Sequence, residues 1–211
     1  MRSTRSSLLA AACSIACMLT VPVAHAQEQP AAVVQHASDL AVGVCGTCHG
    51  PDGNSLNPMF PRLAGQHASY LEEQLKAFRS ETRGDPNAIA YMWGMASSLS
   101  DETIEALAQY FAGQKAGPGQ PRDRATVARG RDIFEHGIPA QGIPACAACH
   151  GTDALGSSAF PRLAGQHAEY ILLQLSSFQS NMRNVAVMHG VAQGLHASEM
   201  QAVADYLESL P

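Results

Sequence analysis

The chain has 211 residues and a formal net charge of −5, from 13 basic and 18 acidic side chains, and 46% of its residues are hydrophobic. This composition lacks the strongly basic surface that nucleic acids or anionic membranes attract. We therefore expect no nucleic-acid partner, and protein partners that offer a basic docking patch.

The first 26 residues resemble a secretory signal peptide. Two arginines stand near its start, residues 8–19 form a short apolar run, and Ala24-His25-Ala26 is a small-x-small cleavage site. The run is too short to span a bilayer comfortably, and no later apolar stretch reaches about 18 residues. The sequence predicts export to the periplasm with removal of residues 1–26, and peripheral or no membrane association. A retained anchor, or a lipid on Cys13 or Cys17, is the alternative.

A doubled cysteine motif follows. Apolar residues spaced by three and four predict a helix over residues 33–45, which leads into Cys45-Gly-Thr-Cys48-His49. The pattern returns as Cys146-Ala-Ala-Cys149-His150. Two thiols three apart, followed by an imidazole, form the attachment pattern of c-type haem. A single copy would also suit a thioredoxin-type redox pair or half of a zinc site, but the duplication, the terminal histidines and the signal favour two covalently bound haem c groups.

A second repeated segment shows that the chain contains two copies of one domain. Phe60-Pro61-Arg-Leu-Ala-Gly-Gln-His-Ala-Ser-Tyr70 and Phe160-Pro161-Arg-Leu-Ala-Gly-Gln-His-Ala-Glu-Tyr170 agree at ten of eleven positions. Helices are predicted to follow over residues 68–80 and 168–180. A Gly- and Pro-rich stretch, 115–122, is typical of a linker. We therefore expect domains at 27–114 and 123–211.

Each copy then presents a methionine in a predicted loop before its closing helix. The two methionines are Met92 and Met188, and each is followed by x-Gly and, seven residues later, by a leucine. Met95 competes with Met92, but its counterpart is Val191, which cannot bind iron. Closing helices are predicted after an N-cap at Ser100 and from Ser198 to Leu210. Every long periodic stretch is helical, so the predicted fold class is all-α.

These motifs predict how each iron is held. A haem iron bound by His49 or His150 needs a sixth ligand or an open position. Met92 and Met188 are the candidate sixth ligands, and a thioether favours a closed, low-spin iron of fairly high potential. His67 and His167 are weaker candidates. Arg62 and Arg162 are predicted to lie near haem propionates or in solvent.

The chain resembles the dihaem cytochrome c4 family, which consists of two tandem class I cytochrome c domains, each wrapped around one covalently bound haem. The resemblance rests on the two haem motifs, the Phe-Pro-Arg-Leu-Ala-Gly-Gln segments, the Met-x-Gly segments and the closing helices. It implies that the backbone carbonyls of Pro61 and Pro161 accept hydrogen bonds from the haem histidines. It also implies electron carriage in the periplasm, between a respiratory donor complex and a terminal oxidase.

The predicted function is therefore electron transfer rather than catalysis. Two alternatives remain: a haem-bearing electron-transfer subunit of a periplasmic dehydrogenase, and a dihaem peroxidase. A peroxidase needs one iron that accepts peroxide, with acid/base groups beside it, and two matching methionines argue against that. The dehydrogenase subunit would use the same ligands, so the sequence does not separate it from a free carrier.

Overall fold

The computed structural model describes residues 30–157 and 160–211, and the predicted signal peptide lies outside this part of the chain. The described residues form ten α-helices, two π-helical turns and one 3-10 turn. Their only strand-like pairing consists of two isolated bridges. The all-α class predicted from the sequence is confirmed. None of the helices in this part of the chain is long and apolar enough to cross a membrane.

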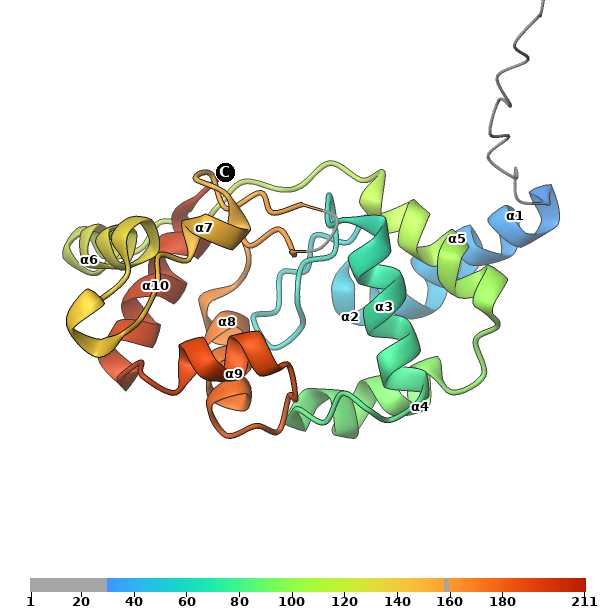
Figure 1. The fold of residues 1–211 in the computed structure, drawn as a ribbon. Coiled ribbons are helices and arrows are strands. Elements are labelled where there is room, and N and C mark those ends of the chain that lie inside the picture. The colour runs from blue at the N-terminus through green and yellow to red at the C-terminus, as the bar shows by residue number, and fades with distance from the viewer. Residues whose placement is uncertain (1–29, 158–159) are drawn as a thin grey trace, which may run out of the picture.

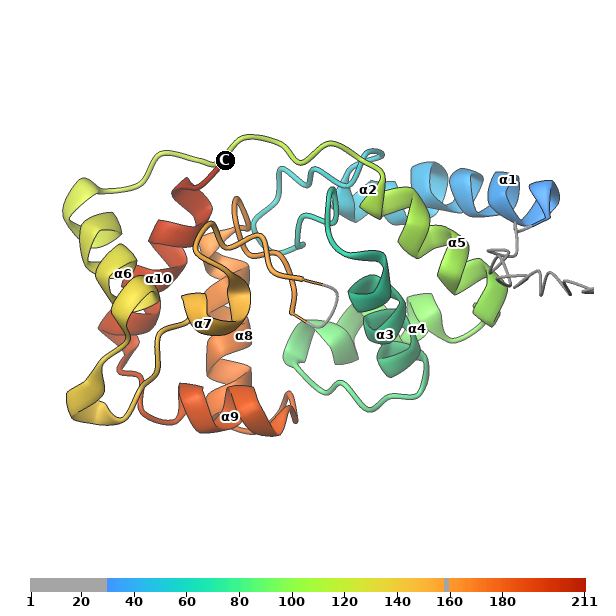
Figure 2. The ribbon, with the colours of Figure 1, turned by 45° about the horizontal axis from the view of Figure 1, so that its top comes forward.

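The helices form two lobes that match the two predicted copies (Figure 1). The first lobe contains α1 (Ala31–Leu40), η1 (Ala41–Cys45), α2 (Gly46–His49), α3 (Ala68–Arg79), η2 (Ala88–Met92), α4 (Trp93–Ala96) and α5 (Asp101–Ala112). The second contains α6 (Arg124–His136), η3 (Pro139–Gln141), α7 (Ala147–His150), α8 (Ala168–Gln179), α9 (Ala186–Ala192) and α10 (Ala197–Ser209). Figure 2 shows the loops after α2 and α7 between the lobes, and the linker running across them.

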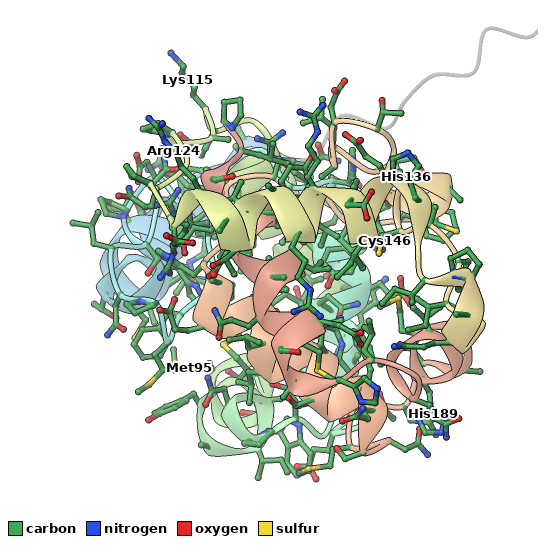
Figure 3. The ribbon with its side chains drawn as sticks, turned by 90° about the vertical axis from the view of Figure 1, so that its left-hand side faces the viewer. Met95, Lys115, Arg124, His136, Cys146 and His189 are labelled. Carbon is green, nitrogen blue, oxygen red and sulfur yellow. The ribbon has the colours of Figure 1, made fainter. Side chains whose placement is uncertain are left out.

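The first and last helices of each lobe pack against each other. In the second lobe α6 crosses α10 (Figure 3), and Gly130 lies at the contact. A Cβ atom at Gly130 would stand 1.8 Å from the Ala202 carbonyl oxygen, so only glycine allows this close approach. In the first lobe α1 contributes the buried Ala37, and η1 the buried Ala41, to the cluster that they share with α5. Small residues thus set the spacing of both helix pairs.

The N-cap residue of each closing helix determines where the helix begins. Ser100 caps α5 as predicted, because its hydroxyl accepts a hydrogen bond from the Thr103 amide at 3.2 Å. The prediction of Ser198 as the start of the second closing helix was wrong, since α10 begins at Ala197 after His196. The Glu199 carboxylate accepts from the His196 amide at 2.7 Å, and the His196 side chain accepts from the Glu199 backbone. Because this reciprocal capping box makes His196 the N-cap, the helix begins one residue before Ser198.

Two glutamine side chains join the lobes through a reciprocal contact. The Gln66 amide donates to the Arg162 carbonyl at 2.9 Å and accepts from the Arg162 N–H at 2.8 Å. Gln166 makes the same pair of bonds to Arg62, both at 2.9 Å. Each side chain therefore completes the backbone hydrogen bonding of the opposite lobe.

The linker is tied to both lobes. In the first lobe Asn54 accepts from the Gly117 amide at 2.7 Å and donates to the Lys115 carbonyl at 3.0 Å. In the second, the Gln120 amide donates to the Glu208 carbonyl at 2.9 Å. These bonds, added to the glutamine contacts, hold the lobes in one relative orientation.

The reciprocal contact predicts a stability effect. Gln66→Ala leaves the part-buried N–H and C=O groups of Arg162 without these partners, which costs about 1–3 kcal/mol of unfolding free energy. Gln35→Ala is the control, because Gln35 is exposed on α1 and bonds only to Asp39, four residues away. Urea unfolding of the two variants and the parent chain measures the difference. Equal stability of Gln66→Ala and Gln35→Ala would contradict a structural role for the contact.

Candidate functional site

Each cysteine motif lies on a short helix that brings its side chains together. Cys45 and Cys146 are half-buried, Cys48 and Cys149 are exposed, and none of these four thiols forms a disulfide. Burial raises the pKa of Cys45, and it raises that of Cys146 to about 11, so these thiols are not thiolates at neutral pH. Within residues 30–157 and 160–211 no cluster of three or more His, Cys, Asp or Glu side chains could hold a metal ion. A zinc site of that type is therefore absent from the described residues.

The histidine of each motif is buried and held through one ring nitrogen. His49 donates from Nδ1 to the Pro61 carbonyl at 2.9 Å, and His150 donates to the Pro161 carbonyl at 3.1 Å. Burial lowers the pKa of both histidines, outweighing the opposite effect of the carbonyl bond. Each ring is therefore neutral with its proton on Nδ1, which leaves the Nε2 lone pair free for an iron. A phenylalanine, Phe60, packs edge-on against the His49 ring with 6.0 Å between centroids.

The candidate methionines lie on helical turns, so the prediction that both are in loops was wrong. Met92 ends the π-helical turn η2, and Met188 lies within α9. Between Pro86 and Met92, and from Ala186 to Met188, the chain has no glycine or proline that would stop a helix. Met92 and Met188 are half-buried against apolar clusters, whereas Met95 is 47% exposed.

The apolar surroundings fit a haem group. In the first lobe the buried residues form two separate clusters, and the half-buried Leu75 and Leu99 contact both. In the second lobe Cys146 and Met188 contact the same apolar cluster. Each lobe thus offers a pair of unpaired thiols, an imidazole with a free Nε2, a thioether and apolar walls. This donor set matches c-type haem with axial His and Met ligation.

The other histidines and arginines of the repeat serve the interface instead. His67 and His167 donate from Nε2 across it, to the carbonyls of Leu155 and Ser55, each at 2.9 Å. Arg62 donates to the Pro118 carbonyl at 2.8 Å and to the Gly165 carbonyl at 3.0 Å. The Arg62 side chain therefore contacts the backbone of the linker and of the second lobe.

Sequence reasoning missed a set of polar side chains that meet at the interface of the two lobes, beside α3 and α8. We call this set the polar interface cluster. Its members are Tyr70, Gln74, Arg83, Asp85, Tyr170, Gln174 and Arg183. Tyr, Gln and Arg each recur exactly 100 residues apart, and that exact spacing was the signal available. Burial lowers the pKa of Arg83, but Tyr170, Tyr70 and Asp85 raise it more, so its guanidinium stays charged.

Comparisons with known proteins agree with this geometry. The family model described as Cytochrome c matches residues 34–115 and 127–211. Cytochrome c4 of Stutzerimonas stutzeri is 39% identical over 180 residues, covering 80% of this chain and 85% of the relative. The thiosulfate dehydrogenase electron acceptor of Stutzerimonas stutzeri strain A1501 is 34% identical over 203 residues, covering 93% of this chain and 92% of the relative.

Solved structures show the same likeness. Cytochrome c4 of Acidithiobacillus ferrooxidans aligns with a TM-score of 0.76 and 44% identity, covering 79% of this chain and 98% of that one. Thiosulfate dehydrogenase TsdBA of Marichromatium purpuratum aligns with a TM-score of 0.75 and 32% identity, covering 84% of this chain but 40% of that one. Like its cytochrome c4 relatives, this chain is an electron-transfer protein rather than an enzyme. The chain belongs to the dihaem cytochrome c4 family, and its two cytochrome c domains carry two covalently attached haem c groups.

Proposed function

We propose that this chain carries single electrons through the periplasm, with each domain holding its haem in the same way. Cys45 and Cys48 bind the first haem by thioether bonds, and Cys146 and Cys149 bind the second. His49 with Met92, and His150 with Met188, are the axial ligands. The observation that supports this most directly is the pair of buried histidines whose Nδ1 atoms are already engaged by proline carbonyls.

The side chains and backbone around each iron suit repeated electron transfer. Each haem supplies a one-electron ferric/ferrous couple when bound. The carbonyls of Pro61 and Pro161 fix the ring orientation of the histidines and raise their basicity as ligands. Met92 and Met188 close the sixth position and favour the reduced state relative to a second imidazole. Ligands held on helices and by backbone bonds change little between oxidation states, which keeps transfer fast.

The cellular setting completes the proposal. Residues 1–26 are a removed signal peptide, domains span 27–114 and 123–211, and 115–122 link them. The c-type haem motifs and the predicted signal both support a periplasmic location. We expect peripheral or no membrane association.

Two models describe the electron donor and acceptor of this chain. In the first, the chain passes electrons from a respiratory donor complex to a terminal oxidase, as the cytochrome c4 resemblance implies. In the second, it accepts electrons from a periplasmic dehydrogenase. The second gains support from a relative named as a thiosulfate dehydrogenase electron acceptor, and from the match to part of a thiosulfate dehydrogenase chain.

Substitution of either methionine tests the ligand assignment. Met92→Ala and Met188→Ala should each let carbon monoxide bind to one of the two reduced haems, because the sixth position opens. The parent chain should bind none. Optical spectra with haem quantified per chain measure the fraction that responds, and each variant should keep both covalent haems.

The matched control is Met95→Ala. Met95 lies on α4, three residues after Met92, and is 47% exposed. Its removal should therefore leave both reduced haems unable to bind carbon monoxide. A carbon monoxide response in Met95→Ala, together with none in Met92→Ala, would assign the first ligand to Met95.

Mixing experiments separate the partner models. Stopped-flow spectroscopy follows reduction of the oxidised chain by a thiosulfate dehydrogenase with thiosulfate, and oxidation of the reduced chain by membranes that contain a terminal oxidase. We expect the oxidase reaction to proceed in either model. Reduction by the dehydrogenase within the turnover time of that enzyme supports the acceptor role. Slower reduction contradicts the acceptor role, so that only the respiratory model remains.

A further inference from the structure

The polar interface cluster is built around two matching arginines. Arg83 donates to the Tyr170 hydroxyl of the second domain at 3.0 Å, and Arg183 donates to the Tyr70 hydroxyl of the first at 2.8 Å. Each guanidinium also lies 4.7 Å from the ring centroid of a phenylalanine in its own domain. Both arginines are 6% exposed. The cluster therefore places two positive charges in the interior, related by the symmetry of the repeat.

One carboxylate breaks that symmetry. Asp85, which is 1% exposed, accepts from Arg83 Nε at 2.7 Å and from Gln174 Nε2 at 3.2 Å. Residues 184–187, which follow Arg183, contain no acid. Arg183 has no ion pair within the described residues. Asp85 therefore forms an ion pair with one of the two buried guanidiniums, although both donate to the same side-chain oxygen of Gln174.

This ion pair belongs to the segment that carries the first methionine ligand. The Ile89 amide donates to the Asp85 carbonyl at 3.1 Å, at the start of the turn that ends at Met92. Trp93, the residue after Met92, donates from its indole nitrogen to the Arg83 carbonyl at 2.8 Å. The backbone of Asp85 and Arg83 is therefore bonded directly to the segment that carries Met92.

A buried charge acts strongly on a nearby haem because the protein interior screens it weakly. Ferric iron carries one more positive charge than ferrous iron, so an anion favours the oxidised haem and an uncompensated cation favours the reduced one. We propose that Asp85 lowers the reduction potential of the first haem relative to the second, and so sets the direction in which an electron moves inside the molecule. This inference rests on the proposed haem ligands.

The test uses the whole two-haem chain and spectroelectrochemical titration. The parent chain should titrate as two haem c groups. Two variants assign the potentials to the domains, because each should lower the potential of one haem: Met92→His that of the first and Met188→His that of the second. Asp85→Asn keeps the side-chain shape and removes the charge. We expect it to raise the first potential more than the second, so that the equilibrium constant for transfer from the first haem to the second falls severalfold.

Three further variants isolate the charge. Asp39→Asn removes an exposed carboxylate of α1, which water and salt screen, so both potentials should stay unchanged. Arg83→Gln should lower the first potential. Arg83→Gln/Asp85→Asn should return it close to the parent value, because the pair is then replaced by neutral groups.

The outcomes are distinct. Equal shifts of both potentials in Asp85→Asn, no shift, or a downward shift of the first would overturn the proposal. If Asp85→Asn alone fails to fold, the comparison of Arg83→Gln with the double variant decides: adding Asp85→Asn must raise the first potential. A parent chain without two haem c waves would instead refute the proposed haem sites, whatever these variants do.

Discussion

The hydrogen bond from a buried histidine Nδ1 to a proline carbonyl is the constraint on which each domain depends. It sets the ring tautomer, and it fixes the end of the loop that starts at the cysteine motif, from His49 to Pro61 in the first domain. The repeated segment after the proline then leads into α3 or α8, which pack against the helical turns that contain the candidate methionines. Without this bond the buried ring would have no hydrogen bond that fixes its orientation.

The same repeated segment also joins the domains. Gln66 and Gln166 follow the prolines by five residues and bond to backbone groups of the opposite domain. The loop that orients each histidine is therefore continuous with the contact that orients the domains. The local order of the two sites and their fixed relative orientation therefore have one origin.

Much of this organisation was predictable because it depends on local patterns. Helical periodicity, the doubled Cys-x-x-Cys-His and the repeated Phe-Pro-Arg segment predicted the all-α class and the two domains. The helical turns around Met92 and Met188 were missed, since a short segment without a breaker gives little periodic signal. Asp85 and Arg83 were missed for another reason. Their partner Gln174 lies about 90 residues away. The recurrence of Arg83 as Arg183 marked a repeated position, but it did not show that the domain interface would bury it, and Asp85 has no counterpart in the second copy.

The glutamine contact has a consequence for how the two halves diverge. A side-chain amide that pairs with a backbone N–H and C=O does not depend on the side chain of the residue it recognises. The side chains at Arg62 and Arg162 are thus free to take different neighbours, and they do: one reaches the linker and the other the C-terminal Pro211. A duplicated gene could in this way keep one docking geometry while selection tuned each half separately.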